Sequence, residues 1–351
     1  MPGAGLFRIA IPVLASLLAG CNPFSDARPM MDEYVERVAR VLDVDPELSD
    51  IDSASQLPRR RDRVLTIPDL EMGMLDFLSL YGCELQQVVG QKNSVMGRVM
   101  QPLNHLRYEI RFIEAARECL PEIEDEDLSE ELVDAIESKL ESLPIAIWNA
   151  TWGVEEVEKL FTLAKGDYPV SPEGNPVSDL ARDIGRLNAT VSRLLSNDLS
   201  VSLEFAGAVQ QRWQAEHRAG QLINSALLLT ARLQDGTEIL RQRTEGRPLC
   251  LNGKPNNQSD ILQNMFFSVY IGEVQPYMSE LARARTRLIV PFEQLAKMQI
   301  ETMPESFRPW YQRHLTQDSQ SSLWHQLDVA MMNHTRAWQD LLEQCGLRPG
   351  A

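Results

Sequence analysis

The stretch QLINSALLLTARLQDGTEIL (221–240) decides the fold class, because its apolar side chains recur at the spacing of one helix face. Only Gly236 interrupts the heptad pattern within this stretch. An uninterrupted pattern of this length is typical of long, coiled-coil-like helices and not of strands. The members of the pattern in this stretch are Leu222, Ala226, Leu229, Leu233 and Leu240.

The same register extends upstream to Asn175-Pro176, a pair that favours the start of a helix. Because the register survives SNDLS (196–200), we expect one helix or two stacked helices, up to about 90 Å long at 1.5 Å per residue. Packing within its own chain is the preferred interpretation of the stripe, and a seam between chains is the alternative. The upstream members are Leu180, Ile184, Leu187, Val191, Leu194, Val201, Phe205, Ala208, Ala215 and Ala219; Asp198 and Arg212 break the pattern.

Helix signals cover most of the remaining chain, and strand alternation is almost absent. The sequence therefore predicts an all-α fold, an elongated multi-helix bundle with long coiled-coil-like helices. An apolar stripe is expected to begin with Val35, Val38 and Leu42, and helices are expected over 69–89 and 101–119, parted by a turn at GQKNSVMG (90–97). A further helix should start near the capping-box-like pair Asp127 and Glu130. A helical region over 259–300 should be bent at Pro276 and Pro291, and a last helix should run from about 319 to Cys345-Gly346.

Two local patterns allow more than one interpretation. The arginines of LPRRRDR (57–63) are expected in a loop on the surface, solvated or paired with acids, and contact with membrane phosphates is the alternative. Trp148 and Trp152 lie one helical turn apart, so we expect them in the core, with a docking ridge as the alternative.

The N-terminus carries a targeting signal in and around LASLLAGCNPF (14–24). An apolar run over 9–19, roughly 11 residues, has the length of a secretory core region and is too short to span a bilayer. The run ends in Leu18-Ala19-Gly20-Cys21, which resembles the lipobox of bacterial lipoproteins. That resemblance implies that residues 1–20 are a removed signal peptide and that Cys21 carries a covalent lipid. Residues 21–28 would then be the lipidated N-terminus and a short tether, and 29–351 a single all-helical periplasmic domain.

The expected partners follow from this N-terminus and from the charge. Two or three acyl chains hold a protein on a membrane durably. Asn22 in place of Asp implies, by the resemblance, the periplasmic face of the outer membrane. The chain has 34 Lys and Arg against 50 Asp and Glu, a net charge of −16, which argues against binding to nucleic acid.

Four further cysteines, Cys83, Cys119, Cys250 and Cys345, follow the lipobox. An even number in an oxidising compartment predicts disulfides. Four cysteines allow three connectivities, of which we favour Cys83–Cys119 and Cys250–Cys345 because each pair could join neighbouring helices. Metal ligation is the weaker alternative, since no C-x-x-C spacing is present.

Three segments behind the lipobox carry a wider resemblance: YGCELQQVVGQKNS (81–94), RYEIRFIEAARECL (107–120) and LPIAIWNATWG (143–153). With the lipobox they resemble a gammaproteobacterial lipoprotein family known as domain of unknown function three-zero-eight-zero. The similarity covers most of the mature chain. The family has no assigned activity, so the resemblance implies a lipoprotein and transfers no catalytic residue.

A search for catalytic and metal-binding patterns is negative. The sequence contains no H-E-x-x-H, Walker loop, G-x-S-x-G or S-x-x-K motif, and its acidic run over 121–131 lacks the spacing of an EF-hand. No histidine has a carboxylate three residues before it, and two of them, nine residues apart, fall on opposite faces of a helix. We therefore expect no metal and no cofactor beyond the lipid, and surface or satisfied polar roles for His105, His217, His314, His325 and His334.

Two functional hypotheses remain. The preferred one is a non-catalytic adaptor or assembly factor of the cell envelope that binds another envelope protein. The alternative is an enzyme or small-ligand carrier with a pocket between helices, assembled from residues distant in sequence. A shallow apolar groove would favour the adaptor, and a deep pocket with converging ionisable groups would favour the enzyme or carrier.

Overall fold

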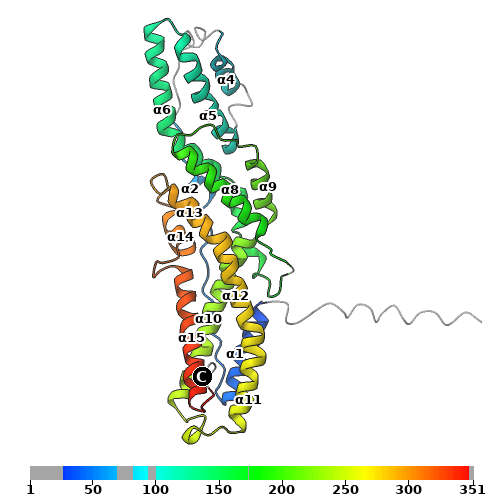
Figure 1. Cartoon of the computed structure of the whole chain (residues 1–351). Helices are drawn as coiled ribbons and strands as arrows, with labels where there is room; N and C mark the ends of the chain where they lie inside the picture. The colour runs from blue at the N-terminus through cyan, green and yellow to red at the C-terminus, as the bar shows by residue number, and fades with distance from the viewer. Residues whose placement is uncertain (1–26, 69–81, 94–99, 173, 348–351) are drawn as a thin grey trace, which may run out of the picture.

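A computed structural model describes residues 27–68, 82–93, 100–172 and 174–347. The described residues form helices and no strands, and the helices assemble into an elongated rod (Figure 1). The predicted all-α, elongated bundle is therefore confirmed. None of the described helices is both long enough and apolar enough to cross a bilayer.

The lower half of the rod in Figure 1 is built around α10 (Arg218–Glu245), which contains the stretch QLINSALLLTARLQDGTEIL (221–240). α1 (Ala27–Leu42) and α15 (Leu323–Glu343) both pack on α10. Because α10 is surrounded, it buries residues on more than one face, from Leu222 through Leu240. Val35, Val38 and Leu42 of α1 are buried as the predicted stripe requires.

The prediction of one helix or two stacked helices over 175–240 is wrong, because the chain forms three helices there, separated by two breaks. α8 (Ser178–Leu195) ends where Asn197 adopts a φ of 60° and its N–H bonds the carbonyl of Leu194. A ten-residue loop follows before α9 (Ala206–Ala215), and α10 begins after another break.

The register of the stripe does not survive these breaks. Ala208 and Ala215, which the stripe places in the core, are exposed. Val209 and Trp213 are buried in their place. The helix also starts later than predicted: it begins at Ser178, and the side chain of Asn175 accepts a hydrogen bond from the N–H of Val177 at 3.2 Å.

The second long helical region is one continuous run over 257–298 that changes its winding twice. Pro276 and Pro291 each follow a π-helical segment, as expected where a residue without an N–H must be accommodated inside a continuing helix. The run consists of α11 (Asn257–Met265), η5 (Phe266–Val274), α12 (Gln275–Ala284), η6 (Arg285–Ile289) and α13 (Val290–Met298).

The upper end of the rod holds α4 (Glu84–Asn93), α5 (Pro102–Cys119) and α6 (Glu126–Thr151). α4 continues through Gly90 to Asn93, where a turn was expected, and the first part of the predicted helix over 69–89 lies outside the described residues. α6 begins earlier than predicted. Its N-cap is Asp125, not Asp127, and the Asp125 carboxylate accepts from the N–H of Leu128 at 3.0 Å.

Residues 43–68, here called the strap, are mostly extended and link the lower half of the rod to α6. Within the strap the short helix α2 (Arg60–Arg63) forms where a loop was expected. Arg63 is fully buried and not on the surface: it donates to the carbonyls of Pro58 and Trp152 and pairs with Glu158. Its cation lies at the C-terminal end of α6, where the helix dipole favours positive charge.

Aromatic side chains fill the junction between the two halves. Trp148 and Trp152 are fully buried and both contact Phe307, so their predicted core position is confirmed. The remaining short helices are η2 (Leu120–Glu122), α7 (Glu156–Leu160), η3 (Leu163–Lys165), η4 (Leu251–Gly253) and α14 (Arg308–His314). The predicted last helix is present but shorter: α15 begins at Leu323 and ends at Glu343, and Gly346 follows it at a φ of 66°.

Candidate functional site

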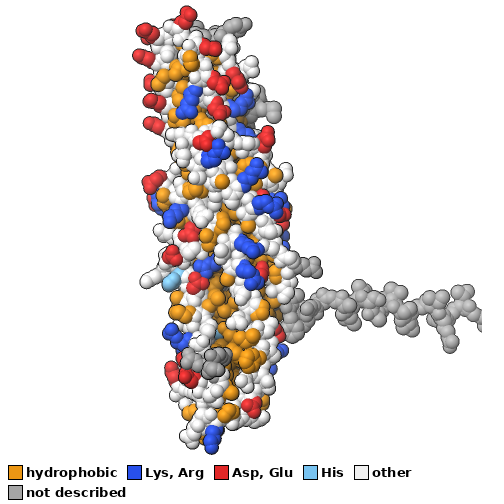
Figure 2. Space-filling model, viewed as in Figure 1, with side chains coloured by type: hydrophobic (Ala, Val, Ile, Leu, Met, Phe, Trp, Pro, Cys, Tyr) orange, Lys and Arg blue, Asp and Glu red, His pale blue; other side chains and the backbone are white. Residues whose placement is uncertain are grey.

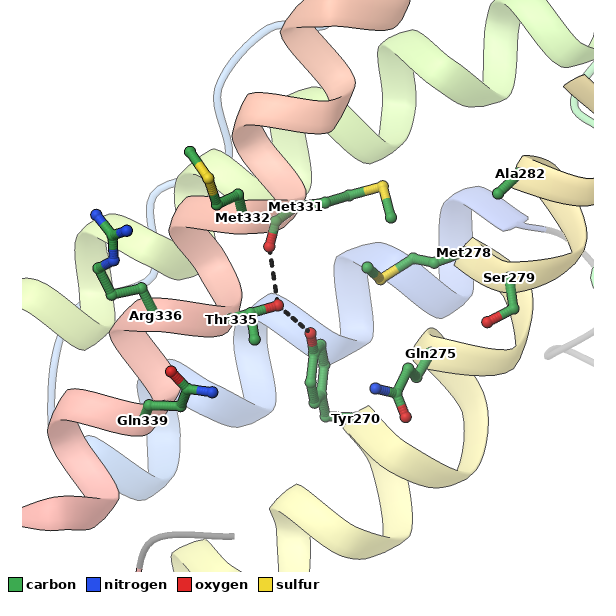
Figure 3. Close-up of a pocket in the computed structure, with 10 residues that line it drawn as sticks. All are labelled: Tyr270, Gln275, Met278, Ser279, Ala282, Met331, Met332, Thr335, Arg336 and Gln339. Atoms are coloured by element: carbon green, nitrogen blue, oxygen red, sulfur yellow. Dashed lines mark hydrogen bonds between the residues drawn. The ribbon is translucent and has the colours of Figure 1, made fainter. Parts of the chain in front are cut away.

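An open groove of about 500 Å³ separates the helical run over 257–298 from α15 (Figure 3). We call it the α12–α15 groove. Its two walls come from segments about fifty residues apart in the sequence, and the backbone of α1 passes behind it in Figure 3. The described lining residues are Tyr270, Gln275, Met278, Ser279, Ala282, Met331, Met332, Thr335, Arg336 and Gln339.

The lining residues share one face of each wall because of their helical spacing. On α12 they recur at intervals of three and four residues, and on α15 at intervals of four. Met278, Met331 and Met332 are among the apolar lining residues; Met278 is buried at the base of its wall, whereas Met332 is 53% exposed. Methionine is unbranched and polarisable, so such a surface adapts to the shape of a partner. Figure 2 shows apolar side chains gathered between the two walls on this face of the rod.

The polar groups of the groove do not form a catalytic arrangement. The Tyr270 hydroxyl lies 3.5 Å from the hydroxyl of Thr335, which donates to the carbonyl of Met331 at 2.9 Å. Burial raises the pKa of Tyr270, so its phenol stays neutral. Arg336 is the one charged residue among the described lining residues, and a single exposed guanidinium offers no acid–base pair.

A buried polar network lies behind Tyr270. Tyr34 of α1 stacks on Tyr270 with ring centroids 5.8 Å apart, and its hydroxyl lies 2.5 Å from Nε2 of His334. The indole N–H of Trp338 donates to the Tyr34 hydroxyl at 2.8 Å. Thr237 lies 3.0 Å from Nδ1 of His334 on the other side of the ring.

The hydrogen bonds fix the protonation of this network. The Thr237 hydroxyl donates to the carbonyl of Leu233 at 2.6 Å, so it accepts from Nδ1–H of His334 and leaves Nε2 to accept from Tyr34. Burial lowers the pKa of His334 to about 3 and raises that of Tyr34, so both groups stay neutral. The network is satisfied and enclosed, and it serves to join α1, α10 and α15.

His314 forms the arrangement that most resembles a nucleophile and its base. It is fully buried, and its Nε2 lies 2.7 Å from the hydroxyl of Ser55 in the strap. Burial lowers the pKa of His314 to about 4, which makes the imidazole a weak base at neutral pH. Its Nδ1 has no hydrogen-bond partner in the described part of the chain, so no carboxylate there orients the ring. The pair fixes the strap to α14 and lacks the third group of a catalytic triad.

The other histidines take structural or surface positions. His105 lies 3.0 Å from Glu109, a buried carboxylate that also pairs with Lys139 at 2.8 Å. His217 lies 3.0 Å from the carbonyl of Lys159, and His325 is partly exposed on α15. Within the described ranges no three residues of the metal-ligating types His, Cys, Asp and Glu lie close enough together to hold a metal ion.

The four cysteines form two disulfides in the connectivity favoured from the sequence. Cys83 is joined to Cys119 with Cα atoms 5.7 Å apart, and Cys250 to Cys345 with Cα atoms 5.1 Å apart. The first connects α4 and α5, and the second connects the segment after α10 to the end of α15. Cys21 and the predicted signal peptide over 1–20 lie outside the described residues.

Comparison with known families agrees with the resemblance of the three quoted segments. The chain belongs to the family described as Protein of unknown function (DUF3080), whose sequence profile matches residues 31–349. Comparison with curated proteins and with solved structures finds no match. The family membership covers the body of the rod, including both walls of the α12–α15 groove.

The α12–α15 groove is the feature that the sequence did not reveal. Its methionines were visible only as scattered residues, because the groove forms where two distant helices stand apart. The exposed Met332 on an otherwise amphipathic helix is the one local signal that could have indicated it.

Proposed function

We propose that this protein is a lipid-anchored, non-catalytic adaptor or assembly factor of the bacterial envelope that binds another envelope protein through the α12–α15 groove. The observation that carries the proposal is the groove itself: it is open, it is lined by three methionines among neutral polar side chains, and Arg336 is the one charged side chain among its described lining residues. An open apolar groove between helices suits recognition of a helical segment of another protein. An enzyme or carrier would require a deeper pocket with polar groups aimed at a small ligand.

The anchor is the second part of the proposal. The lipobox-like Leu18-Ala19-Gly20-Cys21 supports attachment of lipid at Cys21, and Asn22 supports the periplasmic face of the outer membrane. Labelling cells with a clickable palmitate analogue tests this step. The wild type should incorporate label and Cys21→Ser should not; equal label in both would remove the anchor from the proposal.

The groove is tested by placing charge in it. The variant Met332→Glu should stay folded, because the Met332 side chain is 53% exposed, but it should fail to restore the phenotype of a deletion strain. Val133→Glu is the control, since Val133 is 38% exposed on α6 in the other half of the rod. Full restoration by the groove variant would contradict the proposed binding site.

A further inference from the structure

The shape of the α12–α15 groove suits one further helix. Its walls, the run over 257–298 and α15, are antiparallel: Tyr270 lies beside Thr335, while Arg285, further along the run, pairs with the earlier residue Asp328 at 2.7 Å. We propose that the groove binds an amphipathic helix of a membrane-embedded envelope protein, and that this helix presents a carboxylate to Arg336. The membrane-embedded part of this inference rests on the proposed function, because it requires the lipid anchor.

The apolar contact follows from the three methionines. Met278 faces the groove from α12 and Met331 from α15, as Figure 3 shows, and Met332 stands at the edge of the same wall. A helix is about 10 Å wide with its side chains, so its apolar stripe would contact both walls at once. A volume of about 500 Å³ accommodates a few large side chains and not a whole helix, so the polar face of the ligand would remain in solvent.

The charge of the ligand follows from Arg336. Two arginines of the run over 257–298 are paired: Arg283 bonds Glu280 at 2.6 Å, and Arg285 bonds Asp328 at 2.7 Å. Arg336 lies at the outer edge of the groove, where Figure 3 shows its side chain directed away from α12; it is exposed and has no ion-pair partner among the described residues. A guanidinium next to an apolar surface pairs well with a carboxylate, which it can bind through two parallel hydrogen bonds. The ligand helix is therefore amphipathic and acidic at the position that faces Arg336.

The location of the ligand follows from the course of α1. Near the far end of α1, Gln258 donates to the carbonyl of Val41 at 2.9 Å, and nearer its middle Tyr34 stacks on Tyr270. This antiparallel register places the N-terminal end of α1, which begins at Ala27, toward the Met278–Ala282 end of the groove. Cys21 precedes Ala27 by six residues, which reach at most about 20 Å. An anchored groove thus lies near the bilayer surface, within reach of a helix that emerges from it.

A photo-crosslinker at position 332 tests this proposal in intact cells that carry the full chain. Benzoylphenylalanine in place of Met332 should crosslink to a membrane-embedded protein, and the attachment site should map to an amphipathic helix with Asp or Glu close by. Benzoylphenylalanine at Val133 is the control and should not give this product. Arg336→Glu should lower the yield at least tenfold, and changing the mapped carboxylate to Lys should restore it.

Three results would overturn the proposal: a product made of two copies of this chain, an attachment site outside a helix, or a yield that Arg336→Glu leaves unchanged. Absence of any product at position 332, in cells where the anchored protein is functional, would overturn it as well and leave the proposed adaptor without this ligand. A charge-dependent product that persists when Cys21→Ser removes the anchor would support the helix and contradict the membrane-proximal part alone.

Discussion

Gly236 makes room for the buried network behind the groove. A Cβ built on Gly236 would lie 2.9 Å from Cε1 of His334, closer than real Cβ contacts, and His334 is held in place by Tyr34 and Thr237. The break in the heptad pattern at Gly236 is therefore a requirement of packing. From the sequence it appeared only as an interruption, because the partner ring lies 98 residues away.

Gly236→Ala should destabilise the protein by about 1–3 kcal/mol, the range typical of overpacked cores, despite the better helix propensity of alanine. The matched control is Gly185→Ala in α8, where a Cβ meets nothing within 4 Å. That substitution should leave stability unchanged or raise it by roughly 0.5–1 kcal/mol. Urea unfolding of both variants measures the difference, and equal effects would show that His334 does not restrict position 236.

His334 should also make stability depend on pH. Its pKa is lowered to about 3 in the folded protein, whereas an unfolded histidine has a pKa near 6.5. As the pH falls below about 6.5 the unfolded chain binds the proton first, so stability that is complete at pH 7 is lost progressively toward pH 3, at roughly 1 kcal/mol per pH unit.

Replacing the imidazole tests this dependence. Between pH 7 and pH 5, His334→Asn should lose stability less steeply than the wild type, by roughly 1 kcal/mol per pH unit, although it is less stable at pH 7. Thr237→Val keeps the ring buried and should retain the wild-type slope. Identical slopes for His334→Asn and the wild type in urea unfolding would contradict a buried, neutral His334.

At the scale of elements, helical periodicity predicted most helices and failed at their junctions. The stripes of α1, α10 and α15 follow the sequence because each helix buries a continuous apolar face. The loop over 196–205 was missed because the apolar residues before and after it happen to continue one heptad register. A heptad pattern cannot show a loop between two segments that share its register by chance. The available signal in the sequence was the asparagine at position 197, because asparagine tolerates the left-handed conformation that ends α8 there.

The strap shows the opposite failure: its arginines were expected on the surface, solvated or paired with acids, whereas Arg63 is paired with Glu158 but buried. Arg63→Ala removes a buried cation that bonds two carbonyls and Glu158, and should cost about 3 kcal/mol. Arg61→Ala is the control because the Arg61 side chain is 74% exposed, and it should change stability by less than about 0.5 kcal/mol. Thermal and urea unfolding measure both. Equal losses would show that Arg63 does not hold the strap to α6.

At the scale of the whole molecule, the sequence predicted the class and elongated form of the rod but not its groove. Each wall is an ordinary amphipathic helix when taken alone, and the groove exists because α15 and the run over 257–298 stand apart above α1. The absence of motif-like histidine spacing anticipated the structural roles of His105 and His334. Burial of His314 beside Ser55 could not be anticipated, since strap and α14 are 259 residues apart at that contact.

The predicted tether joins the N-terminal end of α1, which lies toward one end of the groove. A short tether raises the local concentration of partners in the same membrane and lowers the entropic cost of meeting them, which suits weak helical contacts. A protein acting on a diffusible substrate would gain nothing from that constraint. We therefore expect that the body must remain anchored in order to function.

Complementation by an unanchored body tests this claim most directly. Replacing the lipobox and Cys21 with an ordinary signal-peptidase site should release a body that is folded and has both disulfides, at native abundance, yet does not restore the deletion phenotype. Replacing that site with the lipobox and cysteine of an unrelated lipoprotein should anchor the body again and restore complementation of the deletion strain. Full restoration by the released body would contradict the membrane-proximal adaptor and favour the enzyme or carrier instead.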